Sequence, residues 1–425
     1  MSDRRQSSVA SARRSNRRSV GPYRTALSQL GLPRVLLTAI LGVIAAGLSF
    51  ALTASTLARR ANPEMAARMM PINSLALAYQ AERLLAEDPL HPKADVGKLA
   101  RSALQLQALN PTALRVLGVV AAARGDERKG RALIFQAQHQ SRRDAPAQFW
   151  LIEDAVQRGD IRTALVHYDI VLRNKPFSHK ILFPILLNAL GDPAIRLALR
   201  RYIRTDDIWA PQFASYALAN SKDLTSLVAL TVESGGLKNP QIAQEQAVGL
   251  IARLVAEYRF AAARRIYLMM PNATPARLIN PGFDKADIEM RYGAIGWQTR
   301  SQSDASSSVV EDDADRPSLL LSANALTTTT IATKLLYLRP GKYHIGIILS
   351  KFEGGEGAAV GGQIRCPAQT GDRTVWSQRA SARMIQGDFM LPTGCDAQYL
   401  DIVVSGGSSA SMLDAAVRSV AVRPQ

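Results

Sequence analysis

The sequence predicts an α+β protein of several domains, in which a transmembrane helix precedes an α-solenoid and a C-terminal antiparallel β-sandwich. Three observations support this prediction: an uncharged apolar run at residues 35–58, helical patterning over residues 59–271, and short strand-like runs over residues 272–425. The chain has 425 residues, which is enough for two or three domains of about 100–200 residues each. With 47% hydrophobic and 20% charged residues, its composition favours a folded chain over a disordered one.

The apolar run VLLTAILGVIAAGLSFALTASTLA occupies residues 35–58 and contains no charge. A helix needs about 20 apolar residues to cross the hydrocarbon core, and a charge at its centre would cost about 2.5–3.5 kcal/mol. The run is also longer than the about 7–15 apolar residues of a cleaved signal peptide. We therefore expect a retained membrane anchor. A cleaved signal peptide and a buried helix of a soluble protein are the alternatives.

The charges that flank this run predict its orientation. Three arginines follow it within a short distance, and eight precede it: Arg4, Arg5, Arg13, Arg14, Arg17, Arg18, Arg24 and Arg34. Because basic flanks stay inside, residues 1–34 should form a disordered cytoplasmic tail on a bacterial inner membrane. The bulk of the chain should then lie in the periplasm. Part of the net charge of +17 is thereby explained by membrane topology and lipid contact, and we expect no nucleic-acid partner.

A repeat organises part of the helical region. Gly125-Asp126 and Gly159-Asp160 lie 34 residues apart, and the aligned units begin at Pro111 and Ala145. Small residues such as Gly118 allow two antiparallel helices to approach closely, and Gly-Asp forms the tight turn between them. A single helical hairpin cannot bury its own apolar face, so neighbouring hairpins must stack. This predicts the solenoid over residues 59–271.

Both units resemble tetratricopeptide repeats. The matching positions are Leu114, Leu117, Gly118, Gly125, Asp126 and Ala137 in the first unit, and Leu151, Ala155, Gly159, Asp160, Ala164, Tyr168 and Pro176 in the second. Two positions depart from the family pattern, since Gly130 replaces the usual Ala and Gln148 replaces a large aromatic residue. The resemblance implies a scaffold that binds a protein partner on its concave face.

Basic residues gather in the first repeat and form a candidate partner-binding surface for an acidic ligand. They are Arg124, Arg128, Lys129, Arg131, Arg142 and Arg143. The alternative is an ordinary solvated helix face. The histidines of this region show no spacing typical of a metal site, so we expect neither a metal nor a cofactor.

After Pro271, short apolar runs alternate with clusters of Gly, Ser, Thr and Asp. This pattern predicts strands at residues 318–322, 328–338, 342–350, 361–366, 387–391, 398–405 and 415–422. Strands at this spacing indicate a sandwich or jelly roll. The polar tract at residues 301–316, SQSDASSSVVEDDADR, is predicted to be a loop.

Three segments of this region resemble carbohydrate-binding modules and other galactose-binding-like jelly rolls. They are LINPGF at residues 278–283 with IGW at 295–297, LRPGKY at 338–343, and the last strand. The resemblance implies sugar binding by aromatic stacking combined with polar groups. It makes Trp376 and Tyr399 candidate glycan contacts, with Trp297 expected in the core. The alternative for each of these aromatic residues is simple burial.

The chain has two cysteines, Cys366 and Cys395, both next to predicted strands. If the predicted topology is right, this domain lies in an oxidising compartment, which favours a disulfide over free thiols. A catalytic thiol would need a histidine partner. His344 is the only histidine after residue 271, and it lies inside a predicted strand.

The sequence contains no GxSxG, HExxH, P-loop or Rossmann fingerprint in a supporting context. We therefore expect a non-catalytic, membrane-anchored envelope scaffold. Its solenoid would bind a protein and its sandwich would bind a glycan or a protein, in polysaccharide or cell-wall assembly. One alternative is a protein–protein scaffold that binds no sugar. The other is a hydrolase that acts on polysaccharide.

Overall fold

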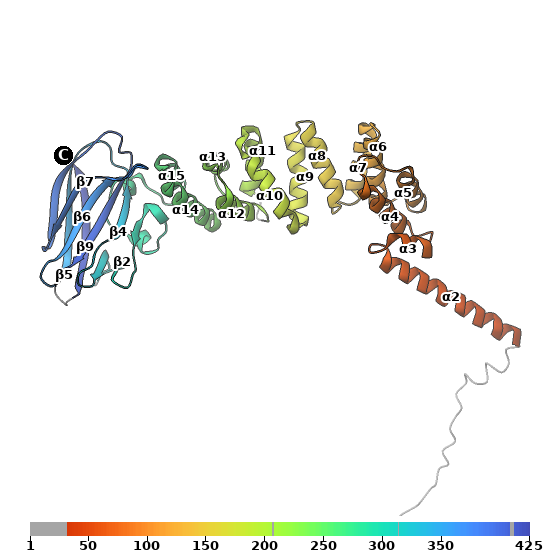
Figure 1. Ribbon diagram of the computed structural model, residues 1–425, viewed down its shortest axis with the longest axis horizontal. Coiled ribbons are helices and arrows are strands. Elements are labelled where there is room, and N and C mark those ends of the chain that lie inside the picture. The colour runs from red at the N-terminus through yellow and green to blue at the C-terminus, as the bar shows by residue number, and fades with distance from the viewer. Residues whose placement is uncertain (1–31, 206–207, 313, 409–411) are drawn as a thin grey trace, which may run out of the picture. The chain divides into compact units, whose positions relative to one another are not determined.

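A computed structural model describes residues 32–205, 208–312, 314–408 and 412–425. It confirms the predicted α+β class, with helices followed by a sandwich of two antiparallel sheets (Figure 1). Nearly all of the predicted tail at residues 1–34 lies outside the described residues. The chain divides into two compact units, residues 1–147 and 148–425.

The helices follow one another closely along the chain. They are α2 (Leu32–Ala58), α3 (Pro63–Met69), α4 (Ser74–Glu87), α5 (Ala94–Leu106), α6 (Pro111–Ala123), α7 (Glu127–Gln140), α8 (Ala145–Gln157), α9 (Ile161–Asn174), α10 (His179–Asn188), α11 (Pro193–Thr205), α12 (Ala210–Asn220), α13 (Leu224–Ser234), α14 (Pro240–Ala256), α15 (Phe260–Tyr267) and α16 (Lys285–Ile288). Short 3₁₀ helices lie at η1 (Pro176–Ser178), η2 (Ala189–Gly191), η3 (Pro275–Leu278) and η4 (Gly293–Ile295).

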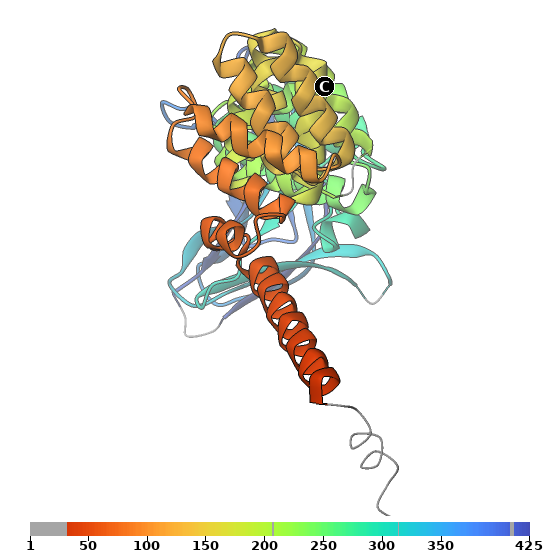
Figure 2. The same ribbon diagram turned by 90° about the vertical axis from the view of Figure 1, so that its right-hand side faces the viewer.

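Helix α2 is long and apolar enough to cross a membrane over Leu36–Ala58. It runs as one uninterrupted helix (Figure 2). Its last turns are fastened to the helices that follow, because the Ser55 hydroxyl donates to the Ala66 carbonyl at 2.9 Å and accepts from the Asn73 side-chain amide at 2.8 Å. The candidate span therefore continues directly into the first folded unit.

The α6–α7 hairpin has the turn that the sequence predicts. Gly125 adopts the left-handed conformation at φ +86°, and the Asp126 carboxylate caps α7 by accepting from the Lys129 N–H at 3.1 Å. The two helices approach so closely that a Cβ on Gly118 would lie 2.9 Å from the Gly130 carbonyl oxygen, and a Cβ on Gly130 would lie 2.8 Å from the Gly118 carbonyl oxygen. Gly130, which departs from the repeat pattern, is therefore required by this close approach. The hairpin is confirmed, while its membership of the tetratricopeptide family stays a prediction.

In the second repeat, the structure explains why Gln148 stands where the repeat pattern has a large aromatic residue. Gln148 and His167 are both buried, and their Oε1 and Nδ1 atoms lie 2.7 Å apart. Burial lowers the pKa of His167 by penalising the charged form of the ring, and the contact with Gln148 supplies the ring with a hydrogen-bond partner. A polar pair thus takes the place of the expected aromatic residue. The turn itself repeats the first one, with Gly159 at φ +69° and Asp160 capping α9.

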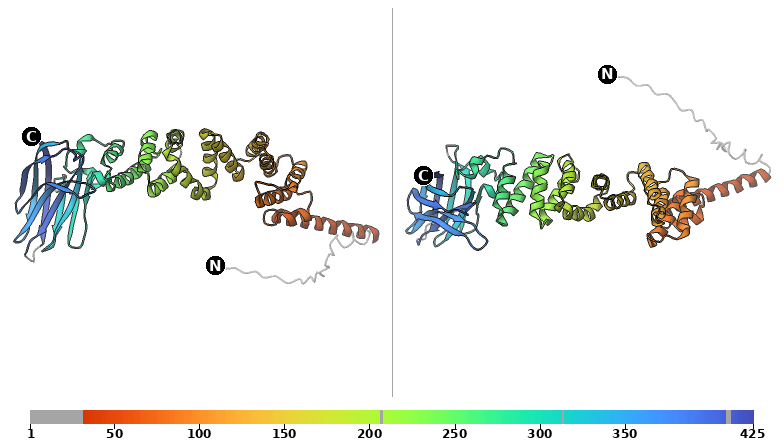
Figure 3. Two further views of the ribbon diagram at one scale, coloured as in Figure 1. Left: turned by 45° about the horizontal axis from the view of Figure 1, so that its top comes forward. Right: turned by 90° about the horizontal axis from the view of Figure 1, so that it is seen from above.

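The C-terminal strands form two five-stranded sheets stacked as layers (Figure 3). The strands are β1 (Trp297–Thr299), β2 (Ala305–Glu311), β3 (Pro317–Ala323), β4 (Thr328–Leu336), β5 (Gly341–Glu353), β6 (Ala358–Cys366), β7 (Arg373–Ala380), β8 (Met384–Leu391), β9 (Gln398–Gly406) and β10 (Leu413–Pro424). Sheet A has the order β1-β4-β9-β6-β7, and sheet B has the order β2-β3-β10-β5-β8. Consecutive strands mostly alternate between the sheets, as expected for a jelly roll.

All seven predicted strands are confirmed, but the loop predicted at residues 301–316 is wrong in part. It contains strand β2, in which Ala305, Ser307 and Val309 alternate toward the core. The Ser307 hydroxyl donates to the Ile331 carbonyl at 2.6 Å. A serine can therefore occupy the buried face of a strand because its hydroxyl is paired. Strands β1 and β7 were also not predicted.

Within the second unit, the last helices and the sandwich share one hydrophobic core. That core joins Leu254, Phe260 and Tyr267 to Leu335 and Tyr337 of the sandwich. The Tyr337 hydroxyl donates to the Phe260 carbonyl at 3.0 Å, and its N–H donates to the Leu278 carbonyl at 2.7 Å. The sandwich thus covers the apolar end of the helical stack, which a terminal repeat would otherwise expose.

A buried ionic cluster joins residues 277–297 to sheet A. Lys334 of β4 is 0% exposed, and its ammonium nitrogen lies 3.5 Å from Asp287 Oδ1. The same carboxylate oxygen lies 3.1 Å from Arg277 Nη1 and accepts from the Trp297 N–H at 3.2 Å. Desolvation lowers the pKa of Lys334 to about 8, because burial penalises the charged form.

Candidate functional site

The outer face of sheet A carries a row of polar side chains across four strands. Thr333 pairs with Asp401, Asp401 pairs with Gln363, and Gln363 pairs with Ser377. Cross-strand partners lie on one face of a sheet, so these four residues line up side by side. The residues that alternate with them, such as Ile364 and Leu400, are buried in the core.

Arg365 organises this face. Its Nη2 atom donates to Asp401 Oδ1 at 3.1 Å, its Nε atom donates to Asp401 Oδ2, and it also forms an ion pair with Asp372. The Thr333 hydroxyl donates to Asp401 Oδ1 at 2.7 Å. The hydrogen bond with Asp401 raises the pKa of Arg365. Both carboxylate oxygens of Asp401 are therefore occupied, and this buried residue holds the guanidinium in place.

Aromatic rings lie beside the polar row. The guanidinium carbon of Arg365 is 5.2 Å from the centroid of the Tyr399 ring, a cation–π distance. Tyr399 is half-buried, meets the Phe260 ring edge-on, and has its pKa raised by burial. Tyr258 lies at the α14–α15 turn with φ +57°, is 41% exposed, and also packs on Phe260.

We call Tyr258, Tyr399, Arg365, Gln363 and Ser377 the sheet A platform. It offers aromatic rings, a fixed guanidinium, a side-chain amide and a hydroxyl on one surface. Such a combination can hydrogen-bond hydroxyl groups while an apolar ring face is covered. The Gln363 amide nitrogen donates to Thr374 Oγ1 at 2.7 Å, which orients its carbonyl oxygen as well.

Of the two candidate glycan contacts, only Tyr399 lies on this platform. Trp376 belongs to β7, but its side chain turns inward and is 9% exposed. Two glycines make room for the indole, since a Cβ on Gly387 would lie 2.5 Å from Trp376 Nε1 and a Cβ on Gly362 would lie 2.8 Å from its ring. This burial fits a packing role for Trp376. Trp297 is buried as expected.

The structure does not gather the six candidate basic residues into one surface. Arg124, Arg128, Lys129 and Arg131 surround the start of α7, whereas Arg142 and Arg143 follow its end. A helix of 14 residues is about 21 Å long, so the two groups lie at opposite ends of α7. Only Arg131 among them is not fully exposed. Their contact with a partner stays a prediction.

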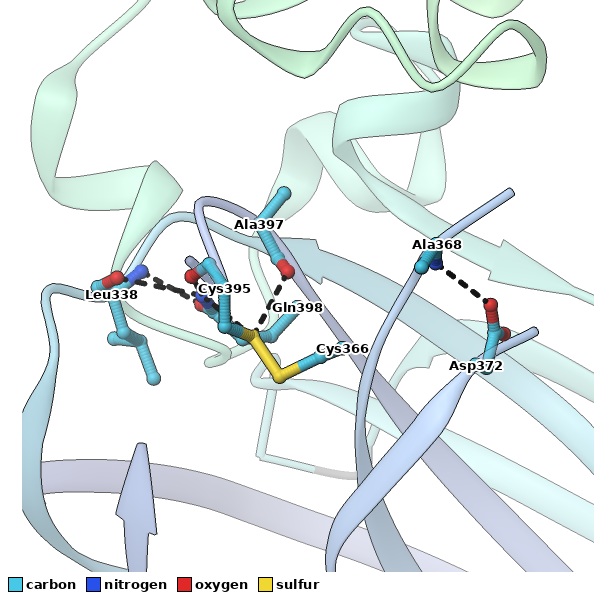
Figure 4. Close-up of a disulfide and its surroundings, with 7 residues drawn as sticks. All are labelled: Leu338, Cys366, Ala368, Asp372, Cys395, Ala397 and Gln398. Carbon is cyan, nitrogen blue, oxygen red and sulfur yellow. Dashed lines mark hydrogen bonds between the residues drawn. A yellow bond between two sulfur atoms is a disulfide. The ribbon is translucent and has the colours of Figure 1, made fainter. Parts of the chain in front are cut away.

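The predicted disulfide between Cys366 and Cys395 is present (Figure 4). It joins the end of β6 to the loop before β9, with Cα atoms 5.5 Å apart. The buried Gln398 side chain supports this loop, because its amide nitrogen donates to the Cys395 carbonyl at 2.6 Å and its oxygen accepts from the Leu338 N–H at 2.8 Å. The bridge thus fixes the end of β6, the strand that carries Gln363 and Arg365.

Several residues of the platform were not found from the sequence. In β6, Gln363 and Arg365 alternate with Gly362, Ile364 and Cys366, so the strand period alone could have placed them on an outer face. No sequence pattern marks Tyr258 as a site residue, because it belongs to the turn between α14 and α15 and comes near sheet A only through tertiary packing on Phe260. Across the described ranges, no group of three or more His, Cys, Asp or Glu residues could hold a metal ion.

No protein-family model and no curated protein matches the sequence. Several solved structures of carbohydrate-binding modules match part of it. TmCBM61 in complex with β-1,4-galactotriose matches with 11% identity and a TM-score of 0.23, over 34% of this chain and 99% of that one. A family 29 carbohydrate-binding module from Piromyces equi matches with 15% identity and a TM-score of 0.16, over 30% of this chain and 87% of that one. These scores are too low to support an argument about function.

Proposed function

We propose that this protein is a non-catalytic, membrane-anchored envelope scaffold, in which the helical repeats bind a protein partner and the β-sandwich binds a glycan. The observation that carries the glycan part is the sheet A platform. There, the Tyr399 ring adjoins the fixed guanidinium of Arg365, and the Tyr258 and Tyr399 rings both pack on Phe260. Stacking on a ring, combined with hydrogen bonds to hydroxyl groups, is the chemistry that sugar recognition needs.

The anchor and the disulfide support an extracytoplasmic location. The excess of arginines before residue 35 favours a cytoplasmic N-terminus, which would leave residues 59–425 outside. A disulfide such as Cys366–Cys395 forms and persists in an oxidising compartment of that kind. In this proposal, the protein holds a protein partner and a polysaccharide together at the membrane surface, during polysaccharide or cell-wall assembly.

Glycan binding by the full-length protein in detergent micelles tests the proposal. We expect binding to at least one neutral envelope polysaccharide, and a loss of about tenfold in Tyr258→Ala and in Gln363→Ala, equal to about 1.4 kcal/mol for each variant. Phe177→Ala is the matched control, because Phe177 is an exposed aromatic residue outside the platform. Failure to bind any envelope glycan would remove the sugar-binding part. Hydrolysis of a bound polysaccharide would overturn the non-catalytic part.

A second candidate function is a protein–protein scaffold in which the sandwich binds no sugar. The shared core favours it, because Leu335 of β4 and Tyr337 just after that strand already pack against the last helices. In that case the sandwich serves as the terminal cap of the solenoid. Affinity capture of a protein partner, together with the absence of glycan binding, would establish this second function.

A further inference from the structure

A pocket of about 820 Å³ lies where the last long helical hairpin, the segment after it and the sandwich meet. Its walls come from Arg264 of α15, from Pro275 and residues 278–280, from residues 337–339 and Tyr343, and from the end of β10 at residues 421–424. Pockets for small ligands usually measure about 300–1,000 Å³. This one is large enough for several sugar rings or for a comparable ligand, and it lies outside the sheet A platform.

The pocket is strongly basic. Arg264, Arg339 and Arg423 line it from three different segments, and none of the described residues that line it is acidic. All three arginines are exposed, and within the described ranges none of them forms a salt bridge or a side-chain hydrogen bond. Their guanidinium groups are therefore available to pair with an anionic ligand.

Hydrogen bonds and ring stacking fix the two tyrosines, Tyr337 and Tyr343, that line the pocket with these arginines. The Tyr337 hydroxyl and N–H are both bonded to the helical side, and the Tyr343 hydroxyl donates to the Arg339 carbonyl at 2.8 Å. Tyr343 also stacks on Phe389, with ring centroids 5.5 Å apart. Burial raises the pKa of Tyr337 and the charge of Arg264 opposes that rise, so Arg264 stands close to this wall. The arginines thus project from a preformed pocket.

We propose that this pocket binds an acidic oligosaccharide, a sugar chain that carries carboxylate groups. Guanidinium groups pair with carboxylates through two parallel hydrogen bonds, and three of them from separate segments match a ligand with several spaced charges. The side chain of Ile279 also lines the pocket and is 50% exposed, which suits the C–H face of a sugar ring. The choice of a saccharide over another polyanion rests on the proposed envelope function.

The test measures binding of the full-length protein in detergent micelles to a short oligogalacturonate at low salt. The neutral comparison is the same oligosaccharide after carboxyl reduction. We expect the acidic form to bind at least about tenfold more tightly than the reduced form, because each charge-assisted hydrogen bond strengthens binding. Arg339→Gln and Arg423→Gln should each weaken oligogalacturonate binding by about tenfold.

Arg418→Gln is the matched control, because Arg418 is exposed on the same strand, β10, but does not line the pocket. An equal loss in this control would indicate general charge attraction and would overturn the inference. Displacement of the oligosaccharide by inorganic phosphate alone, at equal concentration, would reduce the pocket to a simple anion site and would also overturn it. If neutral glycans bind through the platform while the acidic form has no advantage, this inference fails and the proposed function stands.

Discussion

Lys334 is a cation inside the core of the sandwich. Its partner Asp287 lies 3.5 Å away and is shared with Arg277, so the lysine relies on a single long contact. Removing charge from water is costly, and a single ion pair at this distance offsets that cost only in part. Asp287, by contrast, holds two cations and the Trp297 N–H. Removal of Asp287 and removal of Lys334 should therefore have very different effects on the free energy of unfolding.

We expect Asp287→Ala to lower the free energy of unfolding by about 3–5 kcal/mol, because it leaves Lys334 buried without its partner. Lys334→Met should be neutral or stabilising, since it removes a buried charge and fills the same space. Denaturant unfolding of both variants at pH 7 checks this. If Lys334→Met is as unstable as Asp287→Ala, the cluster is a net source of stability.

The same lysine predicts a dependence on pH. Its pKa is about 8 in the folded protein, against an ordinary value of 10.5. Between these values the unfolded chain holds a proton that the folded protein has released, so stability rises with pH, by up to about 3 kcal/mol. Below pH 8 both states hold the proton and the contribution is constant. Measured from pH 7 to 10, the stability advantage of Lys334→Met over the wild type should shrink; an unchanged difference would contradict the lowered pKa.

Helices and strands with long apolar patterns were predicted from the sequence, whereas short strands rich in polar residues were missed. The helix starts at Pro111 and Ala145 were predicted, because proline, glycine and aspartate mark both ends of each hairpin. Strand β2 was missed because three consecutive serines interrupt its apolar pattern, one of them, Ser307, on the buried side. Strand β7 was missed because Trp376 is its one buried side chain. In the candidate site, Tyr399 was named in advance, whereas Tyr258 comes near it only through tertiary packing.

The α6–α7 hairpin gives a test of the close approach between helices. Gly118→Ala should destabilise the protein by about 1–3 kcal/mol, because the new Cβ would lie 2.4 Å from Ile134 Cγ1 and 2.9 Å from a backbone oxygen. Gly97→Ala in α5 is the control, since its nearest neighbour would be 3.6 Å away. That substitution should stabilise the helix by about 0.5–1 kcal/mol. Thermal unfolding of both variants distinguishes them, and equal effects would refute a requirement for glycine at residue 118.

At the scale of the molecule, the second unit is a helical stack and a sandwich held by one core. The domain boundary at residue 271 stays a prediction: short helical segments follow that residue, the first strand begins at Trp297, and packing continues across it through Tyr337 and Phe260. Sequence patterns report secondary structure along the chain. They do not report which apolar faces join, and for that reason the shared core was not predicted.

The disulfide tests both stability and location. It closes a loop of 29 residues, and closure of such a loop contributes about 3.5 kcal/mol in the chain-entropy model. Cys366→Ser with Cys395→Ser should therefore lower stability by about that amount, measured by denaturant unfolding against the oxidised wild type. Mass spectrometry of the native protein should find Cys366 and Cys395 bonded to each other. Two free thiols would weaken the proposed extracytoplasmic location.

The position of β10 in sheet B has a consequence for biosynthesis. It is the last of the ten strands in chain order, yet it lies in the middle of its sheet, between β3 and β5. While the ribosome is still making the earlier strands, β2 and β3 on one side and β5 and β8 on the other lack the strand that joins them. The sandwich must therefore fold after translation of residue 424, and shorter products should be recognised by proteases as unfinished chains.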